Sequence, residues 1–532
     1  MERRDFIKLS VGLTGLLPAM QACNTGNKII PGSIIGASSG LGHMIRDKVF
    51  ADPDEITTQK VVIVGGGVSG LSAARCLTQA GIDGITLLDL EAQMGGNAAS
   101  GGNAISRYPW GAHYVPLPNN ELTEYLSFLE SCNVITGWDE KGLPVYNEFH
   151  LCQDPEERLY INGRWQEGLV PHFGLNSTEL AEFSRFFSLM KELRYQKGSD
   201  GKDAFAIPVD QSSKDEQYVR LDQITMKDWM EEKGFTNTYI RWYVDYCTRD
   251  DFGTPYDRIS AWAGIHYFAS RKGKGNNAAH HDVLTWEQGN GFLVEHLLQQ
   301  VKGDIRNGAL VTAVKDTGNG VQVNYYDVQS KKLVGIKADH CIIATPHFVA
   351  ARLLQDTDRL QAVQEYMEYA PWMIANLTVG PVQERSGAGE SWDNVIYGSR
   401  SLGYVDATHQ QVQQVKPKRN LTYYLPLTEG DPATARKNAM GKTHEQWTRE
   451  IIGDLKRIHT DIEQSVEHID IMLWGHAMAQ PRPGWIHGDV RHRLGADRGA
   501  HIHFAHTDMA GISIFEEAFY QGIKAARKIT GV

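Results

Sequence analysis

A glycine-rich stretch constrains the fold of this chain more than any other feature. Residues 61–100 read VVIVGGGVSGLSAARCLTQAGIDGITLLDLEAQMGGNAAS, with Gly65, Gly67 and Gly70 in G-x-G-x-x-G spacing. The apolar run before the glycines predicts a buried parallel strand, and the run after them predicts a helix. Gly65 permits the tight turn, Gly67 lets a pyrophosphate approach the backbone, and Gly70 lets the helix pack on the strand. The pattern therefore predicts a dinucleotide site.

The residues that follow supply the other contacts of such a site. Ser69 belongs to the first turn of the predicted helix, where free N–H groups and the helix dipole favour phosphate. A second predicted strand over residues 85–88 delivers Asp89, whose carboxylate can accept hydrogen bonds from both ribose hydroxyls. NAD and FAD both bind to units of this kind, so the unit alone leaves the choice between them open.

A second glycine pair favours FAD. Gly95 and Gly96 follow Asp89 after a short linker, and Asn97 comes next. The whole segment resembles the FAD signature of the flavin amine oxidase and phytoene desaturase superfamily, where the strand-end acid is followed by a linker and G-G-R. Asn97 stands where that motif has arginine. The resemblance implies FAD as the cofactor, with Gly95, Gly96 and Asn97 among its contacts.

Residues 284–350 resemble the middle segment of the same superfamily, with a glycine turn, a helix, a β-hairpin and a strand ending in A-T-P. Val311 matches the valine whose backbone touches adenine. Ala344 and Thr345 end the last strand, where the resemblance brings the chain close to the dinucleotide.

Residues 502–532 resemble the C-terminal motif of the superfamily. The resemblance implies a helix that begins at Phe515 and directs its N-terminus at the flavin, where its dipole stabilises negative charge on the reduced ring. Ile514 occupies the position of a tyrosine that forms half of an aromatic cage in monoamine oxidases. A cage of that kind is therefore not expected here.

Two short segments are the candidates for the flavin face. Gly111 and Ala112 match a glycine–alanine step that runs past the isoalloxazine in the superfamily, and His113 follows them. We expect His113 to act on the substrate or to be a structural histidine.

The second candidate is the triplet His506, Thr507 and Asp508, at the place of the acid that contacts flavin in the superfamily. Asp508 is expected to bind a ribityl hydroxyl and Thr507 to lie beside it. His506 is a second candidate catalytic base or substrate contact.

The predicted fold class is α/β, with a discontinuous Rossmann-like FAD-binding domain and an α+β substrate-binding domain in an amine-oxidase-like arrangement. The expected divisions are a signal peptide at 1–23, a leader or linker at 24–57, the FAD-binding domain at 58–118, 284–350 and 465–532, and the substrate domain at 119–283 and 351–464.

The first 23 residues predict export. Arg3 and Arg4 precede a short stretch ending in Lys8 and a modest apolar run, which closely resembles a twin-arginine signal and implies the twin-arginine machinery as a partner. The run is too short to span a bilayer. Cys23 follows an alanine, so either lipid anchoring at Cys23 or soluble release into the periplasm is expected.

Bulk composition excludes several function classes. The chain has 532 residues, 42% hydrophobic, and a net charge of −11, which argues against nucleic acid as a partner. Its six cysteines form no C-x-x-C pair. His501 and His503 alternate as on one strand face, but no carboxylate or cysteine is arranged to complete a metal site, and none is predicted.

We therefore predict an exported FAD-dependent oxidoreductase whose small-molecule substrate is an amine, oxidised at its C–N bond by hydride transfer to flavin N5. Two alternatives stay open. One is an FAD-dependent desaturase or isomerase of an apolar substrate. The other is a non-catalytic flavin-bound accessory protein.

Overall fold

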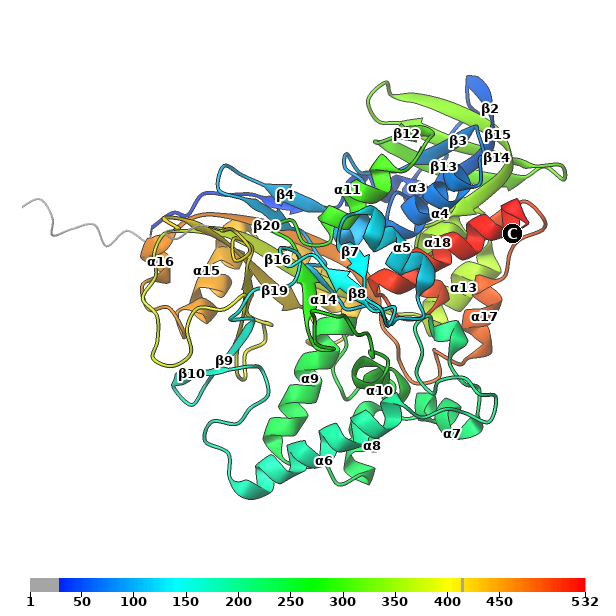
Figure 1. The fold of residues 1–532 in the computed structure, drawn as a ribbon. Helices are drawn as coiled ribbons and strands as arrows, with labels where there is room; N and C mark the ends of the chain where they lie inside the picture. The colour runs from blue at the N-terminus through cyan, green and yellow to red at the C-terminus, as the bar shows by residue number, and fades with distance from the viewer. Residues whose placement is uncertain (1–27, 413–415, 532) are drawn as a thin grey trace, which may run out of the picture.

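The protein is described by a computed structural model that covers residues 28–412 and 416–531. Two β-sheets dominate it, one at the upper right and one across the middle left of Figure 1, and a group of helices lies below them. This confirms the predicted α/β fold class. The predicted signal peptide and Cys23 lie outside the described residues. No helix among those residues is both long and apolar enough to cross a membrane.

The first sheet has seven strands and carries the glycine-rich turn. Its central strands β2 and β3 run parallel, with Val61 to Val64 opposite Ile85 to Leu88, as the sequence predicts. Parallel strands buried on both faces favour such continuous β-branched runs. In sheet order the strands are β12 (Asp304–Arg306), β3 (Ile85–Leu88), β2 (Glu55–Val64), β15 (Lys332–Ile343), β14 (Val321–Asp327) and β13 (Ala309–Asp316), with β21 (Ile502–Phe504) parallel to the end of β15.

Three helices pack beside the glycine-rich strand. α4 (Val68–Gln79) follows the turn and packs against α18 (Phe515–Thr530) and α11 (Gly291–Gln299). Gly522 allows α18 to approach α4 closely, because a Cβ at this position would lie 2.2 Å from the Ser69 carbonyl oxygen. The helices α4 and α18 are thus neighbours although they lie near opposite ends of the chain, as their blue and red colours in Figure 1 show.

The second sheet has eight strands and forms one wall of the site. Its long strands β16 and β20 pair antiparallel. Every residue of β16 is buried, so both faces of this strand are covered. In sheet order the strands are β1 (Ile34–Gly36), β20 (Val466–Ala479), β16 (Tyr369–Val379), β19 (Arg419–Pro426), β18 (Tyr404–Asp406), β17 (Asp393–Ile396), β9 (Glu157–Ile161) and β10 (Arg164–Glu167).

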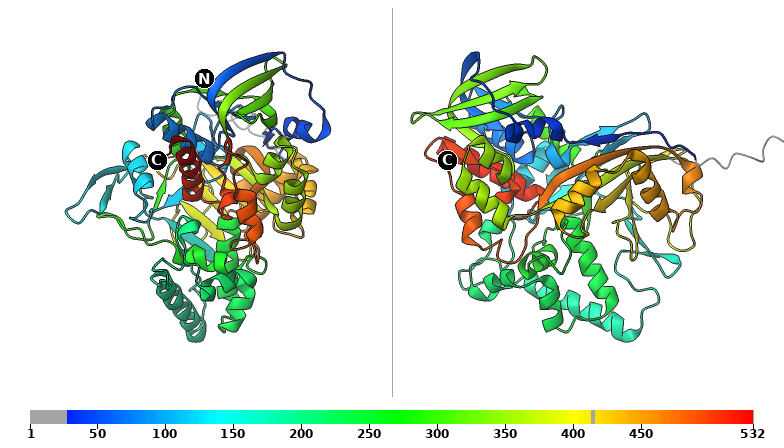
Figure 2. Two further views of the ribbon diagram at one scale, coloured as in Figure 1. Left: turned by 90° about the vertical axis from the view of Figure 1, so that its right-hand side faces the viewer. Right: turned by 180° about the vertical axis from the view of Figure 1, so that it is seen from behind.

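The helices form three groups around these sheets. One lies at the bottom of Figure 1, a second beside the eight-stranded sheet and a third below α18. The two further views show the same groups (Figure 2). The bottom group is α6 (Ser177–Arg194), α7 (Glu216–Val219), α8 (Met226–Glu232), α9 (Thr238–Phe252) and α10 (Ala261–Ala269); the second is α14 (Pro432–Met440), α15 (His444–Leu455) and α16 (Ile462–Ser465); the third is α12 (His347–Leu353), α13 (Thr357–Tyr366) and α17 (Asp489–Gly495).

Short elements connect these layers. They are α5 (Thr123–Ser131), the two-stranded pairs β4 (Ser100–Gly102) with β5 (Arg107–Pro109), β6 (Tyr114–Pro116) with β11 (Val283–Thr285) and β7 (Ile135–Trp138) with β8 (Pro144–Tyr146), and the 3-10 turns η1 (Gly96–Ala98), η2 (Val209–Gln211), η3 (Arg220–Gln223) and η4 (Thr507–Met509).

The sheet topology moves two of the predicted divisions. β20 begins at Val466 and pairs with β16, so it belongs to the eight-stranded sheet although the sequence assigns 465–532 to the FAD-binding domain. Part of the expected linker at 24–57 is also folded. β1 adds to the edge of β20, and two single turns follow it, α2 (Ser39–Gly42) and α3 (Met44–Asp47).

The folded linker segment is anchored by both apolar and polar contacts. Ile30 is only 6% exposed and belongs to the core beside the eight-stranded sheet. The Ser38 amide and hydroxyl both donate to the Glu91 carboxylate, each at 2.8 Å. The segment therefore links the edge of one sheet to the loop that follows β3.

Candidate functional site

The glycine-rich turn leaves room for a ligand at one glycine and packs tightly at the other two. A Cβ on Gly65 would lie 2.5 Å from the Ala344 carbonyl oxygen, and one on Gly70 would lie 1.9 Å from that of Gly65. A Cβ on Gly67 would meet no atom within 4 Å. Gly67 thus borders open space at the N-terminus of α4, beside the buried Ser69, as a bound pyrophosphate requires.

Asp89 lies at the end of β3 beside this space. Its Oδ2 accepts a hydrogen bond from the Gly66 amide at 2.5 Å, and its Oδ1 accepts one from the Glu91 amide at 2.7 Å. Burial raises the pKa of Asp89 to about 6, and these two hydrogen bonds oppose the rise. Each carboxylate oxygen keeps a second lone pair, so the predicted ribose contact stays possible in this geometry.

The second glycine pair packs directly on the first. The Gly95 amide donates to the Gly66 carbonyl at 2.9 Å, and a Cβ on Gly96 would lie 3.4 Å from the Gly67 Cα. Both glycines have positive φ, 125° and 56°, which favours glycine. Asn97 donates its side-chain amide to the Ala477 carbonyl and lines the cavity described below.

Two predicted cofactor residues present buried oxygens that make no hydrogen bond within the protein. They are Thr345 Oγ1 and Asp508 Oδ1, which have no hydrogen-bond partner among the described residues, although Asp508 Oδ1 lies 3.1 Å from His506 Nδ1. Asp508 is fully buried, and its Oδ2 accepts from the Tyr369 hydroxyl at 2.5 Å and the His347 amide at 2.9 Å. Together with the space at Gly67, these unpaired oxygens fit a cofactor rich in hydroxyl and phosphate groups, such as FAD.

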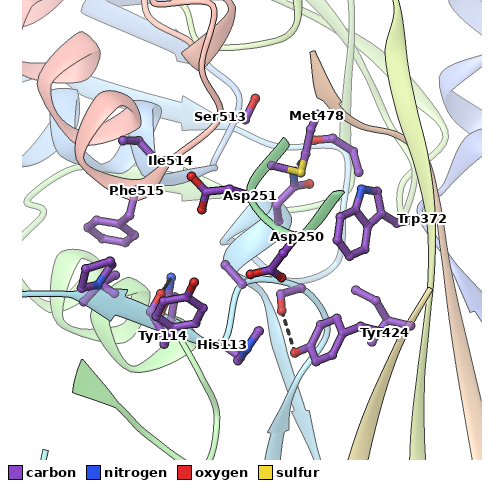
Figure 3. Close-up of a pocket in the computed structure, with 18 of the residues that line it drawn as sticks. His113, Tyr114, Asp250, Asp251, Trp372, Tyr424, Met478, Ser513, Ile514 and Phe515 are labelled. Atoms are coloured by element: carbon purple, nitrogen blue, oxygen red, sulfur yellow. Dashed lines mark hydrogen bonds between the residues drawn. The ribbon is translucent and has the colours of Figure 1, made fainter. Parts of the chain in front are cut away.

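A cavity of about 150 Å³ begins where this cradle ends. It lies between the start of α18 and the strands β16, β19 and β20, with the end of α9 closing another side (Figure 3). Several predicted residues line it, namely Asn97, Gly111, Ala112, His113 and Phe515. Residues around Asn97, around His113 and at the start of α18 therefore line one cavity, whereas the triplet at 506–508 is not part of its lining.

Aromatic rings form much of the cavity's wall around His113. The His113 ring centroid lies 4.6 Å from that of Tyr424 and 4.9 Å from that of Tyr114. The Tyr424 hydroxyl donates to the Gly111 carbonyl at 3.0 Å (Figure 3). Burial lowers the pKa of His113 to about 3, so its imidazole is neutral at physiological pH.

Two adjacent carboxylates, those of Asp250 and Asp251, project into the same cavity from the C-terminal end of α9 (Figure 3). None of the ion pairs among the described residues involves either of them. Burial raises the pKa of Asp250 to about 7, and the Asp251 carboxylate adds to the rise. Burial likewise raises the pKa of Asp251 to about 6, although the nearby Arg271 guanidinium opposes it.

The one arginine that lines the cavity is already paired. Arg271 forms an ion pair with Glu516, which is 1% exposed and lies in the first turn of α18. Its positive charge is thus compensated before any substrate enters. With Asp250 and Asp251 included, the ionised groups that line the cavity carry more negative than positive charge.

The remaining predicted residues lie outside this cavity's lining. His506 accepts a hydrogen bond from the Asp508 amide at 3.1 Å and so caps η4, and Thr507 begins that turn. Val311 is 6% exposed within β13. The structure therefore does not bring His506 to the substrate cavity, and its catalytic role stays a prediction.

Sequence reasoning missed both carboxylates and most of the cavity's aromatic wall. Trp372, Tyr424 and Trp474 come from the eight-stranded sheet. The RDDF sequence at 249–252 was the available signal, but a charged run at a helix end usually marks a solvated surface. Its side chains reach the site only through long-range packing.

The described residues contain no cluster of three or more histidine, cysteine or acidic side chains suited to a metal ion. His501 and His503 lie beside His340, with ring centroids 5.7 and 5.5 Å from it. None of these three histidines lines the cavity.

The sequence profile of flavin containing amine oxidoreductases matches residues 68–530. No curated protein matches the chain by sequence. The profile's range includes every residue that lines the cavity, and it begins just after β2 and the turn that carries Gly65 and Gly67.

Solved structures share the fold at low identity. Putrescine oxidase bound to putrescine aligns with a TM-score of 0.64 and 16% identity, over 90% of this chain and 100% of that chain. Cyclohexylamine oxidase from Brevibacterium oxydans IH-35A aligns with 0.62 and 15%, over 89% and 99%. A fatty acid isomerase from P. acnes aligns with 0.61 and 15%, over 88% and 97%. The same fold thus serves proteins that are named for different substrates.

Proposed function

This chain belongs to the family of flavin-containing amine oxidoreductases, and from its cavity we propose that it oxidises the carbon–nitrogen bond of an amine. It is an FAD-dependent oxidoreductase. FAD, when bound, supplies the hydride acceptor. Gly65, Gly67, Gly70 and Asp89 would hold its adenosine diphosphate half, and the cavity lining would meet its ring.

The observation that carries the proposal is the unpaired carboxylate of Asp250 in an aromatic cavity. Most amines are cations at neutral pH, and a desolvated carboxylate attracts a cation strongly. Trp372, Tyr114 and Tyr424 add ring faces, which also favour ammonium groups. Negative charge and aromatic walls together select a cationic substrate.

Asp250 is also suited to take a proton. An ammonium group must lose one proton to free the nitrogen lone pair before the neighbouring carbon can give up a hydride. A base works best when its pKa lies near the operating pH. The Asp250 carboxylate, with a pKa of about 7, meets this condition better than His113, with a pKa of about 3.

The remaining residues position the substrate and limit water. The aromatic side chains around His113 keep the reacting carbon in an apolar part of the cavity, and Asp250 receives the ammonium proton. Loss of that proton and then of a hydride converts the ammonium ion to an iminium ion. Water then adds to the iminium carbon, and the products are an aldehyde or ketone and the released amine or ammonia.

The same fold in a fatty acid isomerase raises an alternative, a desaturase or isomerase of an apolar acid. The cavity's charges disfavour it. A fatty acid carboxylate would meet Asp250 and Asp251 without a free cation, because Arg271 pairs with Glu516. The two acids also disfavour a non-catalytic accessory role, because burying carboxylates without ion-pair partners costs stability and a protein that only carries flavin has no use for them.

The test is anaerobic mixing of the purified FAD-loaded protein with primary amines and, separately, with unsaturated fatty acids, while the visible flavin band is followed. The proposal expects bleaching by at least one amine and none by the fatty acids. Persistence of the band with every amine, in a folded protein that retains FAD, would contradict it.

We also propose that the protein is exported by the twin-arginine machinery, with FAD inserted before export. The support is Arg3 and Arg4 at the head of the N-terminal sequence. Replacing both with lysine should leave the flavoprotein in the cytoplasm, as cell fractionation with in-gel fluorescence of FAD would reveal. Labelling with a radioactive fatty acid, with Cys23→Ser as the control, separates a lipid anchor from soluble release.

A further inference from the structure

The chain crosses from one sheet to the other before it enters β2. It first pairs with β20 through β1, at the edge of the eight-stranded sheet. After α2 and α3, the ring centroid of Phe50 lies 6.4 Å from that of Tyr326 on β14 of the seven-stranded sheet. The right-hand view of Figure 2 shows this segment in dark blue, leading from one sheet to the other. We call residues 37–50 the strap.

One part of the strap is bonded to the loop that carries Asp89. The Ser38 amide and hydroxyl donate to the Glu91 carboxylate, and the Glu91 amide in turn donates to Asp89 Oδ1 at 2.7 Å. A Cβ on Gly42 would lie 3.6 Å from Leu90 Cδ2, so α2 also lies in contact range of this loop. A single residue, Glu91, thus separates the strap from the predicted ribose contact.

The strap also packs beside two further residues that are predicted to bind the cofactor. Ile45 of α3 packs against the core cluster to which Leu88 and Val311 belong. The helix α3 packs on α12, which begins directly after Thr345 and Pro346. Asp89, Val311 and Thr345 therefore all belong to, or directly adjoin, elements that the strap contacts.

The apolar side chains of the strap are only partly covered by protein. Leu41, Met44 and Ile45 are half-buried, and no residue of α2 or α3 is fully buried. An adenosine group held between the strap and the cradle would remove more of this apolar surface from water, which favours binding. The strap is thus less well packed than a purely structural segment, at the place where the cradle has its predicted adenine and ribose contacts.

We propose that the strap covers the adenosine half of bound FAD and retains the cofactor. A ligand on an open cradle leaves when its own contacts break, whereas a covered ligand leaves only when the cover also opens. Because the strap is anchored at both ends, ordering it over the ligand costs little additional conformational entropy. The strap precedes residue 68, where the family profile begins. The inference concerns the cofactor and does not depend on which substrate is oxidised.

The first test measures how fast bound FAD exchanges with an excess of radiolabelled FAD, followed by rapid filtration of the protein. Replacing Ser38→Ala and Ile45→Ser together removes a hydrogen bond and an apolar contact of the strap, and should raise the exchange rate about tenfold or more. Ser38→Ala alone should raise it several-fold, so the test does not depend on Ile45→Ser folding. Circular dichroism of each variant verifies its fold.

The matched control is Val49→Ser, at a position in the strap that is fully exposed. It makes the same kind of change, from a β-branched apolar side chain to serine, without removing a contact of the strap. This variant should exchange FAD at the wild-type rate.

The second test compares tryptic cleavage of the wild-type protein with FAD bound and after FAD has been removed. Arg46 and Lys48 are exposed, at the end of α3 and just beyond it. Bound FAD should hold the strap in place and slow cleavage after these two residues about fivefold or more. Cleavage after Lys141, in the exposed turn between β7 and β8, should be equal in the two forms.

Three outcomes would overturn the assignment of the strap. They are an unchanged exchange rate in the folded variants, an equal rise of that rate in Val49→Ser, and equal cleavage after Arg46 and Lys48 with and without FAD. None of these results bears on amine oxidation, because neither test includes a substrate.

Discussion

At the scale of single residues, Asp250 combines a high pKa with a place in the cavity. Burial stabilises its neutral form, and the adjacent Asp251 carboxylate acts in the same direction. Structural carboxylates in proteins are usually hydrogen-bonded or ion-paired, which lowers their pKa, as Asp508 illustrates with its lowered pKa beside His506 and Tyr369. Asp250 has the opposite behaviour, as expected for a group whose partner is a transient ligand.

The pH dependence of amine oxidation tests this role. Asp250 must be ionised to accept the ammonium proton, so kcat/KM should fall as the pH drops through about 7, the pKa of this group. Asp250→Asn removes the acceptor and should lower kcat/KM about a hundredfold or more, with the acid limb near pH 7 absent.

The exposed Asp257→Asn serves as the control and should keep both the rate and the acid limb. An unchanged acid limb in Asp250→Asn would show that another group accepts the proton. Replacing a buried carboxylate by a neutral isostere is not expected to destabilise the protein, and thermal unfolding of each variant checks this.

At the scale of elements, the β2–turn–α4 unit can be tested without disturbing its packing. Gly67→Val places its side chain in open space, because no atom lies within 4 Å of the position of its Cβ. The variant should fold with a normal far-UV circular dichroism spectrum and yet be colourless after purification, since the valine occupies the place of the pyrophosphate.

Gly137→Val on β7 is the matched control, because a Cβ there also meets nothing within 4 Å. It should retain FAD in wild-type amount. A yellow Gly67→Val protein with full FAD occupancy would contradict the assignment of the cradle.

The segment before β2 is part of the fold, and neighbouring isoleucines allow a paired test. Ile30 is 6% exposed within the core, whereas Ile29 is 92% exposed. Ile30→Ala should lower the free energy of unfolding by about 2–5 kcal/mol, and Ile29→Ala should change it by less than about 0.5 kcal/mol. Denaturant titration measures both, and equal effects would mean that the segment is not docked in solution.

At the scale of the whole molecule, the sequence predicts the parts of the fold that have local signatures. The predicted strand over residues 85–88 is β3 itself, and the predicted helix start at Phe515 is the start of α18. Both are bounded by glycines or by a sharp change in apolar pattern. The expected linker and the boundary at 465 lack such marks, because the pairing of β1 with β20 and of β20 with β16 determines them.

The substrate side of the site could not be predicted because its residues are brought together only by packing. His113, Asp250, Tyr424 and Phe515 line one cavity from four distant segments. Asp250 and Asp251 follow Arg249 at a helix end, where a charged run usually marks a solvated surface. Only the arrangement of α9 against the eight-stranded sheet turns them inward.

The product stoichiometry of one anaerobic turnover tests most directly whether this cavity oxidises an amine. Purified FAD-loaded protein is mixed separately with an excess of each of a series of primary alkyl- and arylalkylamines, and flavin bleaching, aldehyde and ammonia are quantified. We expect complete loss of the visible flavin band with at least one amine, with one aldehyde and one ammonia for each FAD. A band that persists with every amine, or bleaching without release of aldehyde and ammonia, would contradict amine oxidation.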